Sequence, residues 1–230
     1  MKTIAIIPAR GDSKRLPHKN ILDLGGIPLI AHSILYAKAN SDILDAIYVS
    51  TNDEEIKKIA IEYGAKVIDR PEYISGDFEP TITAIQHVLE NVDATVEHVV
   101  LLQPTNPLRP IHLLKDCWNT YKKVDKEGLF TVTRNHNKLG RIIKNGFQPF
   151  NYEIGQRSQD LEPLYFENGL LYISTVKLIK QGKIISDTSF PFEVNSIFAN
   201  VDIDTQEDLD YAEYLFQKHT PNPSQEGGVE

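Results

Sequence analysis

The stretch TIAIIPARGDSKRLPHKN, residues 3–20, decides the fold, because an apolar run ends in it and a basic loop begins. The run Thr3–Ile7 is short, continuous and rich in isoleucine, which is typical of a strand buried on both faces of a parallel sheet. Five basic or potentially basic side chains follow it: Arg10, Lys14, Arg15, His18 and Lys19. A loop that leaves a parallel strand and enters a helix is a common place for phosphate, so this loop predicts an anion site. A solvated basic surface loop is the alternative interpretation.

Outward from this stretch, strand and helix patterns alternate. Three further short runs rich in Val and Ile are expected to be buried strands: Ala46–Ser50, Lys66–Ile68 and His98–Leu102. Apolar residues at helical spacing predict helices at Pro28–Asn40, Asp53–Tyr63 and Thr81–Val92. This alternation predicts an α/β fold with a doubly wound, mainly parallel sheet that is covered by helices on both faces.

The second half of the chain follows a different pattern. Residues 134–168 are polar and irregular, and we expect them to form a small inserted arm away from the main sheet. A strand is predicted at Leu170–Ile173 and a last strand at Phe198–Ile203. An amphipathic helix is expected from Thr205 to about Gln217.

Length and composition predict one domain over residues 1–217, with a tail at 218–230 whose Pro, Gly and polar residues indicate disorder. Because 32 Asp+Glu outnumber 24 Lys+Arg, nonspecific binding to nucleic acid or to a membrane surface is not expected. The longest apolar runs are far below the ~20 residues that cross a bilayer, and the chain starts with a strand pattern rather than a leader peptide. A single cysteine, Cys117, leaves no internal disulfide, so we expect a cytoplasmic protein.

Two aspartates, Asp202 and Asp204, stand at the end of the last predicted strand. Alternation along a strand turns residues i and i+2 to the same face, so both carboxylates can reach one hard cation such as Mg²⁺. Asp204 is also followed three residues later by Glu207, a capping-box spacing that explains Asp204 without a metal. On spacing alone the two interpretations are equal.

The loop LLQPTNPLRP, residues 101–110, follows another buried strand. Gln103 can discriminate the edge of a ligand through its amide, while Pro104 and Pro107 stiffen the loop. An ordinary turn is the alternative. The glycine patterns of P-loops and dinucleotide folds are absent, as is His-Glu-x-x-His, so the common ATPase, dinucleotide and zinc interpretations have no support.

Together these segments resemble the acylneuraminate cytidylyltransferases, the enzymes that make CMP-sialic acid. The resemblance covers about residues 3–215 and rests on IPARGDSKRLPHKN, STND, DRPEYIS, LLQPTNPLR, YFENGLLYIS and VDIDTQEDL. It implies a Rossmann-like nucleotidyltransferase that transfers CMP from CTP to a nine-carbon keto sugar acid and releases pyrophosphate. It also implies Mg²⁺, for which Mn²⁺ can substitute, and a homodimer whose inserted dimerisation arm crosses to the partner's active site.

The resemblance further implies roles for individual residues. On the CTP side it places Ala9, Arg10, Ser13, Lys19, Asn20 and Thr81. On the sugar side it places Arg70, Gln103, Lys138, Arg157, Asn168 and Gly169. The catalytic set is Arg10, Lys19, Asp202 and Asp204, of which the two aspartates hold the metal. N-acetylneuraminate is the first acceptor to consider. Pseudaminic, legionaminic or deaminated neuraminic acid is the alternative, and an inactive nucleotide-binding regulator is an alternative of another class.

Overall fold

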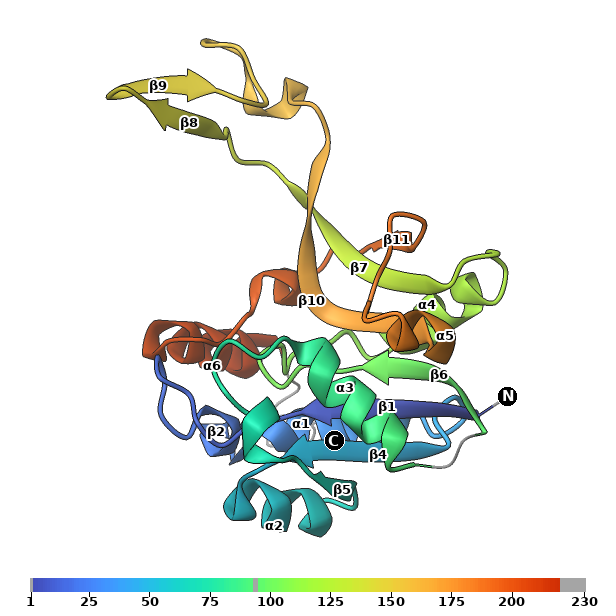
Figure 1. The fold of residues 1–230 in the computed structure, drawn as a ribbon. Coiled ribbons are helices and arrows are strands. Elements are labelled where there is room, and N and C mark those ends of the chain that lie inside the picture. The colour runs from blue at the N-terminus through green and yellow to red at the C-terminus, as the bar shows by residue number, and fades with distance from the viewer. Residues whose placement is uncertain (1, 93–94, 220–230) are drawn as a thin grey trace, which may run out of the picture.

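A seven-stranded, mostly parallel sheet forms the centre of the protein (Figure 1). The computed structural model describes residues 2–92 and 95–219, and the strand order is β11-β7-β10-β6-β1-β4-β5. The strands are β1 (Lys2–Pro8), β4 (Ala46–Thr51), β5 (Lys66–Asp69), β6 (Val96–Leu101), β7 (Gly128–Asn135), β10 (Leu164–Thr175) and β11 (Phe190–Glu193). Strand β1 pairs in parallel with β4 and β6, whereas β10 runs antiparallel to β6 and β7.

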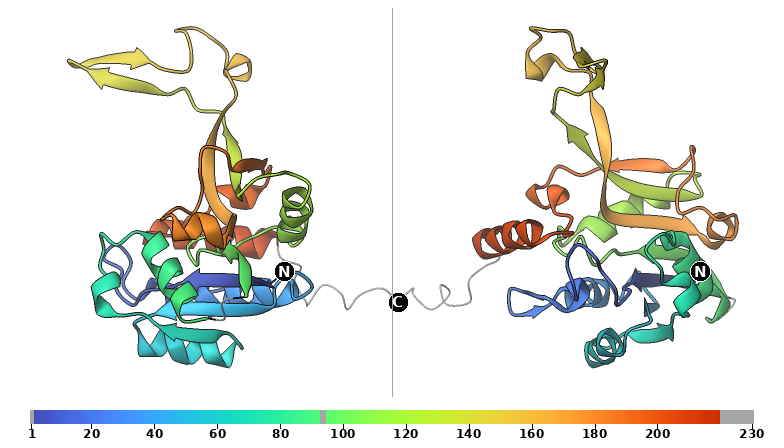
Figure 2. Two further views of the ribbon diagram at one scale, coloured as in Figure 1. Left: turned by 45° about the vertical axis from the view of Figure 1, so that its right-hand side comes forward. Right: turned by 60° about the vertical axis from the view of Figure 1, so that its left-hand side comes forward.

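Helices cover both faces of this sheet (Figures 1 and 2). They are α1 (Leu29–Ala39), α2 (Glu54–Glu62), α3 (Thr81–Glu90), α4 (Leu113–Tyr121), α5 (Val176–Lys180) and α6 (Gln206–His219). Alternation along β1 divides the core, because Ala5 and Ile7 pack with α1, α2 and α4 while Ile4 and Ile6 pack with α3 and α5. The predicted fold class, a mainly parallel α/β sheet, is confirmed.

Most of the first half follows the sequence pattern closely. The strands and helices expected over residues 3–102 lie within two residues of the observed bounds. Short elements complete this half: η1 (Lys19–Ile21), β2 (Asp23–Leu24), β3 (Ile27–Pro28) and η2 (Glu72–Ile74). Within the described residues, no helix combines the length and the apolar character that a bilayer crossing requires.

An arm projects from the sheet between β7 and β10 (Figures 1 and 2). These two strands pair as far out as Asn135 and Leu164, and beyond them β8 (Gly140–Ile143) and β9 (Gly146–Pro149) form a hairpin, followed by η3 (Ser158–Asp160). Residues 134–168 are therefore more regular than their polar composition indicates. Pairing between β7 and β10, which are distant in sequence, supplies part of this order. The hairpin of β8 and β9 supplies the rest through a tight turn at Lys144 and Asn145, both of which have positive φ.

The prediction of a strand at Phe198–Ile203 is wrong. The chain forms a 3₁₀ turn there, η4 (Ile197–Asn200), because Ser196 Oγ accepts a hydrogen bond from the Phe198 N–H at 3.2 Å. The residues that follow are extended but join no ladder. The last helix runs two residues further than expected, to His219, and the rest of the predicted tail, residues 220–230, lies outside the described residues.

Candidate functional site

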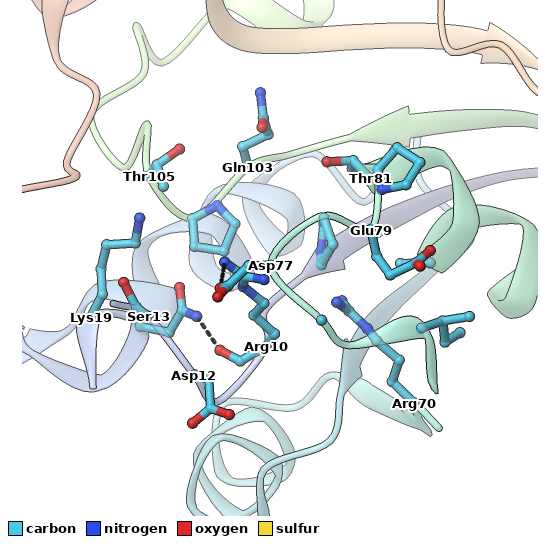
Figure 3. Close-up of a pocket in the computed structure, with 17 residues that line it drawn as sticks. Arg10, Asp12, Ser13, Lys19, Arg70, Asp77, Glu79, Thr81, Gln103 and Thr105 are labelled. Carbon is cyan, nitrogen blue, oxygen red and sulfur yellow. Dashed lines mark hydrogen bonds and ion pairs between the residues drawn. The ribbon is translucent and has the colours of Figure 1, made fainter. Parts of the chain in front are cut away.

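A pocket opens at the carboxyl ends of β1, β5 and β6, where parallel sheets of this kind bind ligands (Figure 3). The loop after β1, the segment 70–84 after β5 and the loop 103–105 after β6 line it. Seven of the predicted site residues belong to its lining: Arg10, Ser13, Lys19, Asn20, Arg70, Thr81 and Gln103. The fold thus brings together side chains from three distant parts of the sequence.

Polar contacts fix the backbone of the loop after β1. Asn20 Nδ2 donates to the carbonyl oxygen of Arg10 at 2.9 Å and closes the loop on itself. The N–H of Gly11 donates to Asn52 Oδ1 at 3.1 Å. A Cβ at position 11 would lie 2.8 Å from Cβ of Asp53, so this close approach requires glycine. The backbone is therefore held in place, and the cationic side chains start from fixed positions.

Asp77 neutralises two of these cations. Its carboxylate lies 2.8 Å from Nη2 of Arg10 and 2.5 Å from Nζ of Lys14. The hydrogen bond from Lys14 and the nearby charge of Arg10 hold the pKa of Asp77 below its ordinary value. Figure 3 places Asp77 against Arg10 within the pocket. The Asp77 carboxylate therefore pairs with the same two cations that would bind a phosphate group in this pocket.

Asp204 pairs with the other two cations of the loop. Its carboxylate lies 2.7 Å from Nζ of Lys19 and 2.6 Å from Nη2 of Arg15. The Lys19 side chain is only 12% exposed, whereas that of Arg15 is 69% exposed. The pair with Lys19 is the better shielded one, and it connects the basic loop to the segment that carries the aspartates.

Arg70 brings a further positive charge into the same pocket. It is buried, and it donates from Nε to Ser50 Oγ at 3.0 Å and from Nη2 to the Ser50 carbonyl oxygen at 2.7 Å. Burial, with a smaller effect of the Arg10 charge, lowers the pKa of Arg70 to about 10. Among the described residues it has no carboxylate partner, so its charge favours an anionic ligand. The structure groups Arg70 with Arg10 and Lys19, whereas the resemblance assigns it to the sugar side.

The two aspartates share one face of an extended segment. Val201 and Ile203 are buried in the core, and this turns Asp202 and Asp204 the other way. Burial raises the pKa of Asp202 above its ordinary value, a hydrogen bond from Thr105 opposes this rise, and the charge of Asp204 adds to it. Two close carboxylates are hard oxygen donors that suit Mg²⁺. Within the described residues, no group of three or more Asp, Glu, His or Cys side chains could hold a metal ion.

The cap of α6 is formed by Thr205 and Asp208, so the proposed capping box of Asp204 with Glu207 is wrong. The N–H of Thr205 donates to Asp208 Oδ2 at 2.8 Å, and the N–H of Asp208 donates to Thr205 Oγ1 at 3.3 Å. The box is displaced by one residue because α6 begins at Gln206. The Asp204 carboxylate is therefore free of capping duty and faces the cations.

Three of the predicted residues serve the fold at this place instead of lining the pocket. Ala9 is fully buried, and its N–H donates to the Ser50 carbonyl oxygen. Asn168 is buried and accepts a hydrogen bond from Thr131 Oγ1 at 2.6 Å. Gly169 has φ 74°, and a Cβ there would lie 2.6 Å from Oδ1 of Asn106. Glycine is needed for this approach.

Lys138 and Arg157 lie on the arm, which projects away from the central sheet of the same chain (Figures 1 and 2). Arg157 is exposed and pairs with Asp160 at 2.8 Å. Lys138 donates to the carbonyl oxygen of Gln156. Neither belongs to the lining of the pocket at the ends of β1, β5 and β6.

A second pocket adjoins the first. Pro80, Thr81 and Gln103 line both, so Thr81 and Gln103 stand at the boundary. The second pocket continues over Ile82, Leu101, Glu167, Tyr172 and the loop 182–185. Sequence reasoning missed Asp77, Glu167 and Tyr172 as residues at the site. Asp77 comes from the segment between η2 and α3, whereas Glu167 and Tyr172 both come from β10, and only the fold brings these two parts of the chain to the same place. Glu167 and Tyr172 flank the predicted Asn168 and Gly169.

A mainly parallel sheet with a pocket that gathers Arg10, Lys19 and Arg70 at the carboxyl ends of its strands is the arrangement of the Rossmann-like nucleotidyltransferases. A family model described as Cytidylyltransferase matches residues 4–225. Solved structures with a similar fold include a CMP:2-keto-3-deoxy-manno-octonic acid synthetase in complex with CTP (TM-score 0.72, 17% identity, 95% of this chain and 99% of that chain). Another is a cytidylyltransferase from Leptospira borgpetersenii (TM-score 0.63, 16% identity, 96% and 89%).

Curated relatives are similar over most of the chain. A pseudaminic acid cytidylyltransferase of Campylobacter jejuni is 35% identical over 94% of this chain and 97% of its own length. A CMP-N,N'-diacetyllegionaminic acid synthase of Legionella pneumophila is 34% identical with the same coverage. An N-acylneuraminate cytidylyltransferase of Streptococcus agalactiae is 32% identical over 91% of this chain and 52% of its own length. The chain belongs to the cytidylyltransferase family, and the predicted enzyme class, a CTP-dependent nucleotidyltransferase, is confirmed.

The pairing of Asp77 with Arg10 and Lys14 predicts that Asp77 competes with the nucleotide. Asp77→Asn should bind CTP more tightly, because the triphosphate no longer has to displace a carboxylate from Arg10 and Lys14. The gain should be about threefold to tenfold, because partly exposed ion pairs contribute little free energy. Titration calorimetry with CTP measures the change. Glu79→Gln removes another acid of the lining that makes no ion pair among the described residues, so it controls for general charge. Equal effects of the two substitutions, or weaker binding by Asp77→Asn, would contradict the prediction.

Proposed function

We propose that this protein transfers CMP from CTP to the anomeric hydroxyl of a sialic-acid-type nine-carbon keto sugar acid. The observation that carries the proposal is that the pocket lined by Arg10, Lys19 and Arg70 shares Thr81 and Gln103 with an adjoining pocket, so two substrates can meet at one boundary. The relatives support the choice of acceptor, because they are named for pseudaminic, legionaminic and neuraminic acids. N-acetylneuraminate is our first acceptor, with pseudaminic, legionaminic or deaminated neuraminic acid as the alternative.

In this reaction the sugar hydroxyl attacks the α-phosphorus, a P–O bond forms, and the bond to the departing pyrophosphate breaks. The triphosphate and the sugar carboxylate are both anionic, so their repulsion has to be offset. The first pocket is lined by Arg10, Lys19 and Arg70, whose positive charges can offset this repulsion. We assign Ser13 and Asn20, which line the same pocket, to the triphosphate as well. The products are a CMP-sugar and pyrophosphate.

We propose that Asp202 and Asp204 hold one Mg²⁺, for which Mn²⁺ can substitute. Two carboxylates on one face fit this ion, because Mg²⁺ in nucleotide enzymes takes one or two carboxylates together with water and phosphate oxygens. When bound, the ion supplies positive charge that stabilises the reacting phosphates. Lys19 would then exchange its partner, from the Asp204 carboxylate to a phosphate oxygen.

We further propose a homodimer in the cytoplasm whose arms complete each other's sites. The arm exposes large apolar side chains: Leu139, Ile142, Ile143, Phe147, Phe150 and Ile154. Ile142 is 83% exposed and Ile154 84%, which favours burial against a second copy. Lys138 and Arg157, remote from the pocket of their own chain, would then reach the sugar carboxylate of the partner. We assign the cytoplasm because the single cysteine, Cys117, is free and buried, which fits a reducing compartment.

Pyrophosphate release tests the reaction directly. The protein is incubated with CTP, ATP, GTP or UTP and with a panel of nine-carbon keto acids, and we expect release only with CTP and a sugar acid together. The panel identifies the acceptor by its kcat/KM. An eight-carbon keto acid serves as the control for acceptor length. Release from CTP alone, or the same release with every nucleotide, would contradict the proposal.

The separation of the cap from the aspartate pair predicts two different failures. Asp204→Asn should lose turnover, because it removes one carboxylate from the metal pair, and should lose at most about 1 kcal/mol of unfolding free energy, because its ion pairs with Arg15 and Lys19 are partly exposed. Thr205→Ala should keep most of its turnover and lose about 1 kcal/mol of unfolding free energy, the usual worth of an N-cap. Urea unfolding and pyrophosphate release measure the two quantities. If Asp204→Asn turned over like the wild type at ordinary Mg²⁺ concentrations, the Asp204 carboxylate would not be a metal ligand, and only Asp202 would remain as one.

Mixing two inactive variants tests the crossing of the arms. Arg10→Ala damages the pocket, and Arg157→Ala damages the arm, so a heterodimer with crossed arms keeps one intact site. After subunit exchange of equal amounts, we expect about one quarter of wild-type turnover, since half of the dimers are mixed and each has one good site of two. Unmixed variants provide the baseline. No recovery, with exchange verified by mass labelling, would reject the arrangement.

A further inference from the structure

The second pocket, which the proposed function assigns to the sugar acid and which we call the acceptor pocket, contains the acidic side chain of Glu167. A negative charge there repels both the phosphates of CTP and the carboxylate of the sugar. Glu167 lines the second pocket together with Tyr172 and Gln103, and it is exposed. Among the described residues it makes no ion pair. An unpaired carboxylate beside two anionic substrates raises their repulsion unless it has another task.

The local fold explains how Glu167 reaches the pocket. Between its pairing with Val132 and the pairing of Tyr172 with Phe130, β10 advances five residues while β7 moves back two. The extra residues form a bulge, and such irregularities are frequent next to active sites, where they re-aim side chains. The bulge places the Tyr172 hydroxyl 3.4 Å from Glu167 Oε2, although five residues separate them.

The same bulge turns the neighbouring residue inward. Asn168 is buried, its Oδ1 accepts a hydrogen bond from Thr131 Oγ1 at 2.6 Å, and its Nδ2 donates one to Thr133 Oγ1 at 3.0 Å. The amide is therefore already hydrogen-bonded within the sheet. Of the pair Glu167 and Asn168, only Glu167 lines the second pocket. The polar group that β10 offers to a ligand at this place is therefore a carboxylate and not an amide.

The surroundings of Glu167 favour hydrogen bonds from a neutral part of the acceptor. Burial, with an added contribution from the charge of Glu167, raises the pKa of Tyr172, so its phenol keeps its proton and acts as a donor. Ile184 and Ile185 supply an apolar wall to the same pocket, and Lys183 beside them lines it with a positive charge. A carboxylate with an apolar wall suits hydroxyl and acylamino groups, whose N–H and O–H donate while methyl groups pack.

We infer that Glu167 is a specificity-determining residue that orients the acceptor. Its carboxylate accepts hydrogen bonds from the hydroxyl or acylamino groups of the sugar and repels the sugar's own carboxylate, which then points away from β10. This inference rests on the proposed function, because it assigns the second pocket to the sugar acid. It names a residue of this chain that the resemblance does not assign.

The test separates the KM for the acceptor from the KM for CTP. Glu167→Gln should raise the acceptor KM about tenfold, since a charged hydrogen-bond partner is replaced by a neutral one, and should leave the CTP KM unchanged. Glu167→Asp keeps the charge and should recover part of the loss. Glu193→Gln is the matched control, because Glu193 shares a neighbouring surface with Glu167 but does not line the acceptor pocket.

Two outcomes would overturn the inference. An acceptor KM of Glu167→Gln equal to that of Glu193→Gln, in an enzyme that releases pyrophosphate, would exclude a role in acceptor recognition. If Glu167→Gln raised only the KM for CTP, Glu167 would act on the nucleotide and not on the acceptor. Calorimetric titration of the wild type with each sugar acid keeps the two proposals apart. Failure of every sugar acid to bind or react would reject the proposed function, whereas an active wild type with unaffected variants rejects only the role of Glu167.

Discussion

Four cations, Arg10, Lys14, Arg15 and Lys19, lie within ten residues after β1. Because like charges so close together repel one another, the loop needs nearby negative charge. Two aspartates provide the opposite charge, Asp77 from the turn before α3 and Asp204 from the segment before α6. These ion pairs join three distant parts of the chain around one pocket. They also preset the positions of the cations, so a triphosphate exchanges places with carboxylates and meets side chains that are already gathered.

The loop after β6 ties this charged region to the rest of the sheet. Asn106 Nδ2 donates to the carbonyl oxygens of Val201 and Asn168, at 2.8 and 3.2 Å, and so joins the aspartate segment to the bulge of β10. Arg109 is buried and donates to the carbonyl oxygens of Leu170 and Gln103, both at 2.7 Å. The loop therefore fixes the segment that carries the aspartates and the bulge of β10 relative to each other. Its own Gln103 stands where the two pockets meet.

Local patterns predicted the elements whose order is local, such as β1 and α1, because periodicity and turn residues decide them. They failed in two places for different reasons. At η4 a local contact, the cap of Ser196 on the Phe198 N–H, makes a turn inside an apolar run typical of a strand. In the arm, order comes from pairing between β7 and β10, which are distant in sequence. At the site, the basic loop was visible as a run of charges. Asp77 and Glu167 were not, since an isolated acid becomes part of a site only through the contacts that the fold creates.

The central claim is that the cations held by Asp77 and Asp204 are the binding site for the triphosphate of CTP. A crystal structure of the protein with CTP and Mg²⁺ tests it most directly. We expect triphosphate oxygens within hydrogen-bond distance of Arg10 and Lys19. Asp77 should be turned away from Arg10, and the carboxylates of Asp202 and Asp204 should bind the metal. A triphosphate bound elsewhere, with both ion pairs of Asp77 and both of Asp204 intact, would contradict it.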